Sequence, residues 1–565
     1  MNTAPRIQAR AAGQPELLPA ELHPVLRRVY AARGVAAAEL RLELKNLLPP
    51  DGLLGLERAA ALLADAIAEQ RQVVIAGDYD ADGATGTALA VLGLRALGAS
   101  RVDYVVPDRF RMGYGLSPAL VDLAVERGAQ LLVTVDNGIA SLAGVAHAKA
   151  LGLGVIVTDH HLPGAELPAA DAIVNPNQPG CGFASKALAG VGVMFYLLMA
   201  LRAELRRRGQ LASEPNLANW LDLVALGTVA DVARLDANNR VLVEQGLRRL
   251  RSGRGRPGLL ALLEAAGRPL AALSATDLGF VLGPRLNAAG RLDDMRAGIE
   301  CLLADSLEVA RPLAQELDRL NRERRALTSQ MSEEAQLLVE DDGAVGLCAF
   351  DESWHEGVVG LVAARLKESR HRPAIAFARA QEAGLLKGSA RSIPGLHIRD
   401  VLAAVDAAHP GLIERFGGHA MAAGLSLSEA RYPEFAAAFD QACRERLSPA
   451  ELERVIETDG ALSTTELSLA TAQVLEQAGP WGAGFPEPQF LGSFRVATLR
   501  LMGREQQHVR YRLDCDTLQL EAVDFGGAER ALAPGAWLQA VYQLGVNRWN
   551  GSELLQLRLI HLEPI

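Results

Sequence analysis

The stretch VVIAGDYDADGATG, residues 73–86, decides the fold, because a short apolar run is followed at once by three carboxylates. The apolar run is typical of a buried strand, and the alanine- and leucine-rich segment after it is typical of a helix. The carboxylates, Asp78, Asp80 and Asp82, repel one another, so the cluster requires a cation, a basic partner or open water. Taken singly, each is also consistent with a helix N-cap or a turn, and the Asp82–Gly83 pair favours a turn.

Strand-like and helix-like segments alternate around this stretch. Apolar residues at helical spacing predict a helix over residues 56–70, and further helices are expected near 118–127 and 141–151. The other strand candidates are VDYVVP (102–107), LLVTVD (131–136) and GVIVTDHH (154–161). Short apolar strands that alternate with helices indicate parallel βαβ units with both faces of the sheet covered. The apolar segment LDLVALGTVADVARL (221–235) fits either a strand or a helix.

Acids recur where these apolar segments end. Asp136 ends LLVTVD, Asp159, His160 and His161 follow the next strand candidate, and Asp231 closes LGTVAD. The carboxyl ends of parallel strands face one crevice in an open α/β sheet, so these positions are expected to converge with the first three acids. Such a cluster requires a cation, and oxygen ligands with one imidazole select Mn²⁺ or Mg²⁺. The sequence therefore predicts a metal site at this edge of the sheet.

The rest of the chain predicts further domains. Residues 306–338 form one long amphipathic pattern, and a second α/β pattern runs from about 341 to 445. After GPWGAGFPEPQF (479–490) alternating residues and turns predict a small antiparallel β domain, either as an open sheet or closed into a barrel. The chain has 565 residues, 49% of them hydrophobic and 22% charged, which is ordinary for a globular protein with several domains.

Charge and cysteine usage exclude some classes of protein. The net charge of −10 argues mildly against a nucleic-acid coat protein, but it does not exclude a nuclease with its basic residues gathered in one groove. The five cysteines are far apart and include no CxxC, which disfavours a zinc or disulfide framework. The first residues lack the apolar core of a secretory signal, and the longest apolar run (187–201) is too short for a membrane span. A cytoplasmic protein without membrane contact is therefore expected.

The motifs DYDADG, VTVDNG, TDHH and GTVADV, in this order and at these spacings, resemble the four motifs of the DHH phosphoesterase family. The segments GYGLSP, GPRLNAAGR, SWHEGVVGLVAARL, GSARS, FGGHAMAAG and GPWGAGFPEPQF extend the resemblance to the single-strand-specific exonucleases of that family. The resemblance runs from about residue 50 to the C-terminus. It is specific in combination, whereas FGGHAMAAG alone fits a glycine-rich packing turn.

The resemblance implies a set of site residues. The metal ligands that it implies are Asp80, Asp82, Asp136, His160 and Asp231, with Asp78 as a ligand or close neighbour. It implies that His161 contacts the scissile phosphate or helps the leaving oxygen, and that Asp159 orients the ligating imidazole. Expected contacts with the DNA strand come from Arg109, Tyr114, Arg285, Asn287, Ser389, Arg391, Gly418 and His419. Tyr114 also fits a packed loop tyrosine, and Asn287 also fits a simple turn residue.

The resemblance also implies a fold and an activity. The fold is an α/β DHH catalytic core and a DHH-associated α/β domain joined by a long helix, with a C-terminal β-barrel like an OB-fold. The expected division is an N-terminal segment (1–50), the catalytic domain (51–300), the helix (301–340), the associated domain (341–450) and the barrel (451–565). The implied activity is 5′→3′ removal of 5′-mononucleotides from single-stranded DNA with two Mn²⁺ or Mg²⁺ ions, in DNA recombination and repair. Single-stranded DNA, a single-strand-binding protein and a helicase are the expected partners.

Three other functions fit parts of the sequence. A DHH phosphodiesterase or pyrophosphatase for small substrates would keep the acids but lack the C-terminal β domain and GPRLNAAGR. A non-catalytic replication scaffold would have lost some metal ligands, whereas every expected acid is present. A dinucleotide-binding oxidoreductase would have G-x-G-x-x-G after VVIA, and that turn is absent from the sequence.

Overall fold

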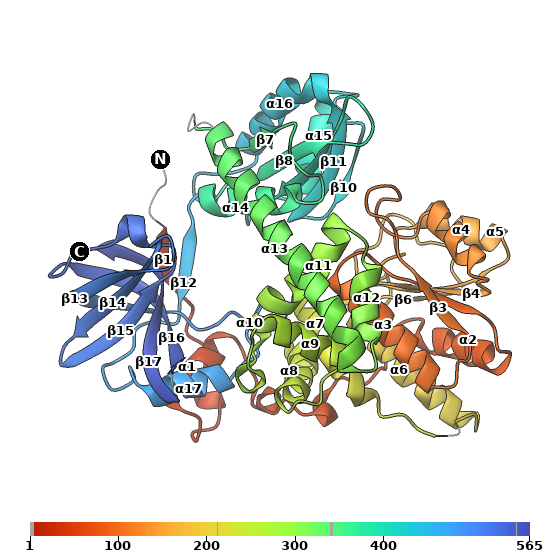
Figure 1. Ribbon diagram of the computed structural model, residues 1–565, viewed down its shortest axis with the longest axis horizontal. Coiled ribbons are helices and arrows are strands. Elements are labelled where there is room, and N and C mark those ends of the chain that lie inside the picture. The colour runs from red at the N-terminus through yellow and green to blue at the C-terminus, as the bar shows by residue number, and fades with distance from the viewer. Residues whose placement is uncertain (1–4, 212, 340–342, 550) are drawn as a thin grey trace. The chain divides into compact units, whose positions relative to one another are not determined.

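The computed structural model describes residues 5–211, 213–339, 343–549 and 551–565 (Figure 1). The chain divides into two compact units, each with its own core. The larger unit comprises residues 9–318 and 457–565, and the smaller unit comprises residues 1–8 and 319–456. Each unit is described below by itself.

The larger unit contains a five-stranded parallel sheet, as the alternating pattern predicts. Its order is β3-β2-β4-β5-β6, and every neighbouring pair is parallel. The strands are β2 (Val73–Ala76), β3 (Val102–Val105), β4 (Leu131–Val135), β5 (Gly154–Thr158) and β6 (Ala172–Val174). Every residue of β2 and β4 is buried, because apolar side chains point to both covered faces of the sheet.

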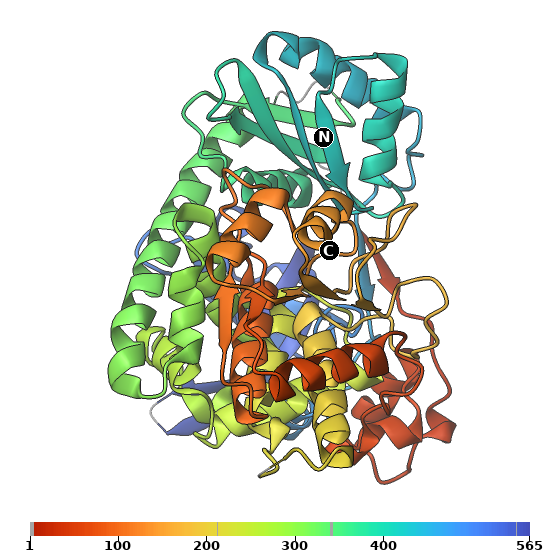
Figure 2. The same cartoon turned by 90° about the vertical axis from the view of Figure 1, so that its right-hand side faces the viewer.

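Helices cover both faces of this sheet (Figures 1 and 2). The helices α4 (Pro118–Glu126) and α5 (Leu142–Ala150) pack on the face that contains Val74, Leu132 and Val155. The helices α2 (Leu56–Ala68), α3 (Ala81–Ala96) and α6 (Gly190–Arg207) contact the sheet on the other side. Most of the apolar run at 187–201 lies in α6, whose residues from Gly190 to Leu198 are all buried.

The segment 221–235, which fits a strand or a helix, is helical over most of its length. It forms α7 (Leu221–Ala230), and Asp231 is the C-cap residue of that helix rather than the end of a strand. Both α3 and α8 pack against α7, and its first eight residues are buried, so the segment carries no one-sided periodicity. The following helices are α8 (Ala237–Arg251), α9 (Pro257–Ala265), α10 (Ala275–Asp277), α11 (Gly283–Leu292) and α12 (Arg296–Leu303).

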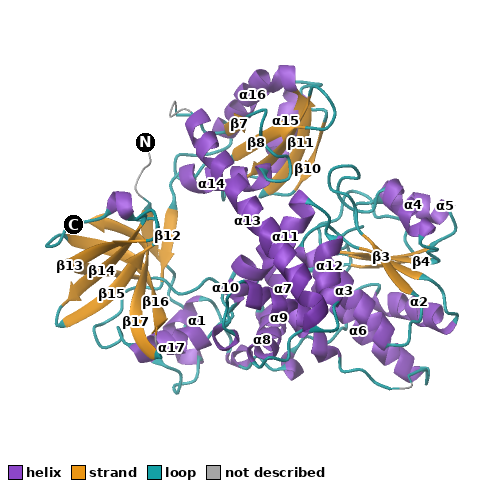
Figure 3. Cartoon of the chain, in the orientation of Figure 1, coloured by secondary structure: helices purple, strands orange, loops and turns teal. Residues whose placement is uncertain are grey.

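The C-terminal part of the larger unit is a closed barrel of five strands, which confirms the predicted β domain (Figure 3). The strands run in the order β13-β14-β15-β17-β16, and all neighbouring pairs are antiparallel except β15 with β17. They are β13 (Phe490–Met502), β14 (His508–Cys515), β15 (Leu518–Asp524), β16 (Trp537–Trp549) and β17 (Ser552–Pro564). The helices α1 (Pro24–Ala32) and α17 (Leu469–Gln477) belong to the same unit.

The smaller unit holds the second α/β pattern, which is also confirmed. Its five-stranded sheet has the order β10-β11-β9-β8-β7 and buries Phe377, Phe435 and Phe439. The elements are β7 (Leu347–Phe350), α14 (Val359–Arg370), β8 (Ala374–Arg379), β9 (Leu385–Arg391), α15 (Ile398–Ala408), β10 (Arg415–Gly418), β11 (Ala422–Ser428) and α16 (Tyr432–Arg444). The long helix α13 (Leu307–Leu338) leads into this unit, close to the predicted range of 306–338. The short strands β1 (Arg6–Ala9) and β12 (Val455–Thr458) form a two-stranded sheet.

Two features of the composition have structural counterparts. All five cysteines are free thiols, in agreement with the absence of a disulfide pattern. A search of the described helices finds none with the length and apolar character that crossing a membrane requires.

Candidate metal centre

The acids that follow β2 and β4 lie at the point where the sheet changes its direction of winding. The strand β2 pairs with β3 on one side and with β4 on the other, so successive connections leave in opposite directions. A crevice opens at such a point, beyond the carboxyl ends of the strands. Asp78, Asp80 and Asp82 follow β2, and Asp136 follows β4.

Backbone N–H groups hold two of these carboxylates. Asp80 is the N-cap residue of α3, and its Oδ1 accepts hydrogen bonds from the N–H of Asp82 and Gly83 at 2.9 and 3.0 Å. Asp82 accepts from the first turn of α6, where the N–H of Gly190 lies 2.6 Å from Oδ2 and that of Val191 lies 2.9 Å from Oδ1. Both carboxylates are therefore fixed in direction before any cation arrives.

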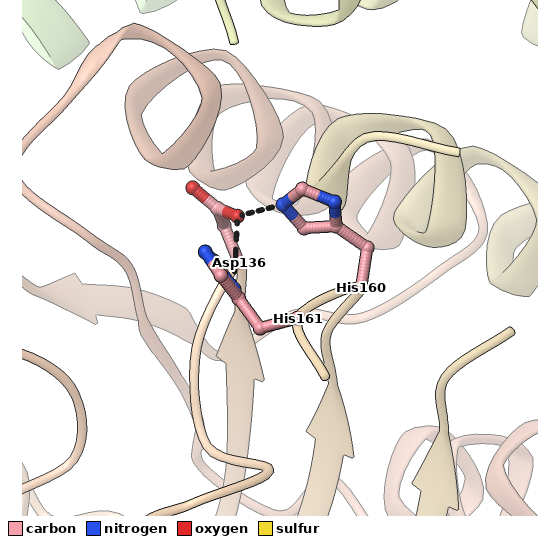
Figure 4. A group of neighbouring side chains, drawn as sticks. All are labelled: Asp136, His160 and His161. Atoms are coloured by element: carbon pink, nitrogen blue, oxygen red, sulfur yellow. Dashed lines mark ion pairs between the residues drawn. The ribbon is translucent and has the colours of Figure 1, made fainter. Parts of the chain in front are cut away.

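Two imidazoles face the carboxylate of Asp136. His160 Nε2 lies 3.0 Å and His161 Nδ1 lies 3.9 Å from the same oxygen, Oδ1 of Asp136 (Figure 4). Asp136 has a φ of +64°, an uncommon conformation for a residue other than glycine. Gly190 permits this arrangement, because a Cβ at that position would lie 2.5 Å from the Cβ of Asp136. Backbone strain at this position is of the kind that accompanies functional sites.

Asp231 joins the cluster from the end of α7. Its Oδ2 lies 3.7 Å from His160 Nε2, which also lies 4.0 Å from Oδ2 of Asp82. Val232 has a φ of +58°, which is strained for a β-branched residue and turns the chain immediately after the acid. The structure thus brings together all six predicted ligands, in the overlapping groups Asp78–Asp80–Asp136, Asp82–His160–Asp231 and Asp136–His160–His161, within each of which one ligand atom per residue lies within 4.8 Å of the others.

The protein alone is electrostatically unfavourable at this point. Burial and the neighbouring Asp80 raise the pKa of Asp82 to about 7. Burial, followed by repulsion from nearby carboxylates, also raises the pKa of Asp78, Asp136 and Asp231 well above the ordinary value of an aspartate. A divalent cation would remove this repulsion and favour the ionised carboxylates.

The residues fit a hard divalent cation. Within the described part of the chain, no hydrogen bond reaches Oδ1 of Asp136, although that atom is buried. A buried carboxylate oxygen that has no hydrogen bond and faces a ring nitrogen 3.0 Å away is a position that a cation can occupy. Five carboxylates with imidazole form a donor set suited to Mn²⁺ or Mg²⁺, and none of the three groups contains a thiolate that would favour zinc.

Asp159 has a different partner from the one expected. It was expected to orient the ligating imidazole of His160, but its Oδ1 lies 2.7 Å from Nδ1 of His161. The same oxygen accepts the backbone N–H of both histidines, at 2.7 and 3.0 Å. Burial lowers the pKa of His161, but the hydrogen bond to Asp159 and the surrounding acids outweigh this effect and raise it to about 9. With no cation bound, the protonated form of His161 is therefore favoured.

Tyr114 and Arg109 lie beside this centre. The Tyr114 hydroxyl donates to the backbone oxygen of Asp136 at 3.1 Å, and its ring packs edge-on against His161. The Arg109 guanidinium lies over the ring of Tyr79, 4.8 Å from its centroid, and the rings of Tyr79 and Tyr114 meet edge-on. Half of the Tyr114 side chain remains exposed, at 52%, so the ring is both packed and accessible.

Two predicted strand-contact residues on α11 are engaged within the protein. The Asn287 side-chain oxygen accepts the N–H of Ala81 at 2.8 Å, which attaches α11 to the loop that carries the acids. Gly290, one turn further on, lies so close to Tyr79 that a Cβ would be 1.9 Å from its backbone oxygen. Arg285 forms an ion pair with Asp318 at 2.8 Å and donates to the backbone oxygen of Val281.

Comparisons with known proteins agree with this fold and centre. The profile of the DHH family, N-terminal domain, matches residues 72–228, that of the DHHA1 domain matches 342–445, and that of the RecJ OB domain matches 458–561. The single-stranded-DNA-specific exonuclease RecJ of Dickeya dadantii is 51% identical, and the match covers 100% of both chains. The chain belongs to the RecJ family.

Solved structures of a RecJ relative extend this result to three dimensions. The crystal structure of Thermus thermophilus RecJ in complex with Mn²⁺ has a TM-score of 0.83 at 32% identity, covering 99% of this chain and 80% of that chain. The complex of the same protein with Mg²⁺ has a TM-score of 0.77 at 31% identity, covering 99% and 78%. The RecJ fold, with two α/β domains and an OB barrel, is thereby established for this chain.

The remaining predicted strand-contact residues lie in the smaller unit. Ser389 and Arg391 are on β9, where the Arg391 Nη1 donates to the Ser389 hydroxyl at 3.0 Å. Gly418 ends β10 with a φ of +143°, and the N–H of His419 donates to the backbone oxygen of Ala422 at 2.8 Å in the turn to β11. A Cβ on Gly418 would lie 2.5 Å from that backbone oxygen, so this turn requires glycine.

Sequence reasoning missed the amides that support the histidine pair. The Asn175 amide donates to the backbone oxygen of His161 at 2.9 Å, and that of Asn177 donates to the backbone oxygen of His160 at 2.5 Å. Asn137 was also missed; its buried amide bridges the backbone oxygens of Ala76 and Val135 and so ties the ends of β2 and β4 together. The signal was available in the sequence, because NPN and DNG directly follow strand-like segments.

Proposed function

We propose that this protein is a metal-dependent 5′→3′ exonuclease that hydrolyses single-stranded DNA to 5′-mononucleotides in DNA recombination and repair. The observation that carries the proposal is the convergence of six candidate ligands from four chain segments at one edge of the sheet. The identity with single-stranded-DNA-specific exonucleases over the whole chain supports the substrate class. The Mn²⁺ and Mg²⁺ complexes of the Thermus relative support divalent ions of that kind, and we propose that two are bound.

The proposed ligands are Asp78, Asp80, Asp82, Asp136, His160 and Asp231. When bound there, the ions would lower the pKa of a water molecule and stabilise charge on a phosphodiester. The backbone donors to Asp80 and Asp82 keep these carboxylates from rotating during the reaction. This rigidity lowers the reorganisation that the reaction would otherwise require.

His161 and Asp159 act on the substrate rather than on an ion in this proposal. With no cation bound, Asp159 and the neighbouring acids raise the pKa of His161 to about 9, and its ring faces the same carboxylate as His160. Asp159 holds Nδ1, and Nε2, which lies 3.2 Å from the Tyr114 hydroxyl, is the nitrogen that we assign to the substrate, where it contacts the scissile phosphate or protonates the leaving oxygen. Tyr114 offers a half-exposed ring on which a base stacks without regard to sequence, beside Arg109.

The proposal assigns the remaining residues to two roles. Arg285, Ser389, Arg391, Gly418 and His419 contact the strand near its 5′-phosphate, since guanidinium, hydroxyl and backbone N–H groups all suit a phosphate. Asn287 holds the acid loop through Ala81, which is a positioning role. The cellular partners that we propose are a single-strand-binding protein and a helicase. We place the protein in the cytoplasm, where its five free thiols stay reduced.

The proposal is tested by digestion with Mn²⁺ of three labelled substrates: 5′-phosphorylated single strand, blunt duplex and RNA. We expect the single strand to be degraded from its 5′ end to mononucleotides, with the duplex spared. Asp136→Asn and His160→Ala should each reduce the rate at least about 100-fold. Loss of a metal ligand should lower activity more than loss of a residue that only hydrogen-bonds to a ligand, which typically costs about 10- to 100-fold. Asp122→Asn is the matched control, since this exposed aspartate on α4 pairs only with His147 among the described residues.

Equal digestion of single strand and duplex would refute the substrate class. Release of mononucleotides from the 3′ end would refute the polarity. Full activity of both ligand variants would refute the site. Hydrolysis restricted to dinucleotides would favour the small-substrate phosphodiesterase instead.

A further inference from the structure

A cavity of about 660 Å³ adjoins the candidate metal centre within the larger unit. His160 and Asp231 are among the residues that line it, and so are Gly484 and Phe485, in the segment that leads to the barrel. Its volume is in the range of cavities that hold a nucleotide-sized ligand. His160 and Asp231 belong to the proposed metal centre, whereas the other lining residues have no role in that centre.

A buried arginine, Arg240 on α8, is another of the lining residues. Its side chain is 2% exposed, and its guanidinium carbon lies 4.1 Å from the ring centroid of Phe485 and 5.8 Å from that of Tyr30. Among the described residues its nearest acid is Glu39 at 3.9 Å, and Nε has no hydrogen-bond partner. A buried guanidinium that makes so few hydrogen bonds is costly, so an anion that accepts from it would be well bound.

The other cations around the cavity divide into two kinds. Arg33 is fully engaged, because it donates to both oxygens of Asp459 and to the backbone oxygen of Pro486. Lys186 donates to the backbone oxygens of Pro176 and Cys181 at 2.7 and 2.8 Å. Arg234, by contrast, is exposed at the rim, and no hydrogen bond of its side chain to another described residue is present. Arg240 and Arg234 are therefore the cations available to a ligand.

A short loop connects the metal centre to α8, the helix that carries Arg240. It runs from Asp231 through the strained Val232 to Asp236, the N-cap residue of α8. The N–H of Leu235 donates to the backbone oxygen of Ala483 at 2.7 Å, so the segment leading to the barrel supports the same loop. A ligand in the cavity would thus contact a loop that begins at Asp231, a candidate metal ligand.

We propose that this cavity holds an internal backbone phosphate of the single strand, bound by Arg240 and Arg234, between the metal centre and the segment that leads to the barrel. A guanidinium recognises a phosphate through paired hydrogen bonds, and Phe485 keeps that of Arg240 in one plane. The ring of Phe485, which lines the cavity, and that of Tyr30, which packs on the same guanidinium, keep water from Arg240 and strengthen the interaction. The inference rests on the proposed function. It concerns an internal phosphate of the strand, whereas the metal centre acts on the scissile phosphate.

Salt dependence of DNA binding tests the proposal. Binding of a 5′-phosphorylated single strand with a 3′ fluorophore is measured by anisotropy in EDTA at a series of KCl concentrations. The variants are Arg240→Met, which keeps an apolar body against Phe485, and Arg234→Gln at the exposed rim. Each should lower the slope of log Kd against log salt by about 0.7, the change expected when the protein neutralises one phosphate fewer on a single strand. Arg248→Met is the control, because Arg248 lies on the same helix, is exposed and pairs with Glu244.

The other outcomes overturn the proposal. Unchanged slopes in both variants would mean that Arg240 only anchors α8 to Phe485 and that no phosphate enters. Weaker inhibition by a 5′-mononucleotide with an unchanged strand slope would mean that the cavity holds the product. If melting curves show that Arg240→Met is unfolded, Arg234→Gln alone decides the matter. Hydrolysis by the wild type with Mn²⁺, measured in parallel, reveals a failure of the proposed function separately.

Discussion

Removal of the cation should make the stability of this protein fall as pH rises, through Asp82. The pKa of this buried carboxyl is raised from the ordinary value of 3.8 to about 7 by burial and by Asp80. A folded-state pKa above the unfolded value contributes stability that is complete below about pH 4 and is lost as pH rises through about 7. The difference corresponds to about 4 kcal/mol, at 1.36 kcal/mol for each unit of pKa.

The other shifts at the centre have the same sign. The pKa values of Asp78, Asp136 and Asp231 are also raised, and that of His161 is raised from 6.5 to about 9, so its contribution too is lost as pH rises through about 9. A bound cation stabilises the ionised carboxylates, so its stabilising effect should grow with pH as fewer protons compete for the ligands. In EDTA the protein should therefore melt at a lower temperature near pH 8 than near pH 5.

The assay is thermal unfolding followed by circular dichroism, with EDTA and with Mn²⁺, across this pH range. Mn²⁺ should raise the melting temperature more at the alkaline end than at the acidic end. Asp82→Asn should show a weaker pH dependence in EDTA, although it also weakens one of the bonds from Gly190 and Val191. Metal-free stability that rises with pH, or an effect of Mn²⁺ that does not change with pH, would refute the reasoning.

Two further substitutions test how the centre is held. Gly190→Ala places a methyl group 2.5 Å from the Cβ of Asp136, which should cost about 1–3 kcal/mol of stability and weaken Mn²⁺ binding in calorimetric titration. Gly192→Ala, whose Cβ would meet only a flexible Leu188 methyl at 3.2 Å, is the control, and equal effects would contradict the steric argument. Asn287→Ala leaves the N–H of Ala81 without its acceptor and should weaken Mn²⁺ binding about 10-fold by displacing the acid loop. Unchanged Mn²⁺ affinity would show that Asn287 does not position the loop.

The sequence is sufficient to predict the sheet and most of the centre for a local reason. An apolar run that ends in an acid marks both a buried parallel strand and the edge at which strands converge, so Asp78, Asp80, Asp82 and Asp136 can be placed from short segments alone. The segment 221–235 shows where this reasoning stops. It is apolar throughout because helices pack on both sides, so its composition does not distinguish α7 from a strand, and Asp231 is the C-cap of a helix.

Only the tertiary structure decides which groups form hydrogen bonds with the acids and hold them in place. The donors to Asp82 come from Gly190 and Val191, more than a hundred residues further along the chain. The imidazole that lies 2.7 Å from Oδ1 of Asp159 is that of His161, a contact that depends on ring orientation and not on spacing. The stacking of Arg240 on Phe485 likewise joins positions far apart in the sequence. Residue type and strand ends specify that a cation is needed, whereas long-range packing determines which backbone and side-chain groups hold its ligands in place.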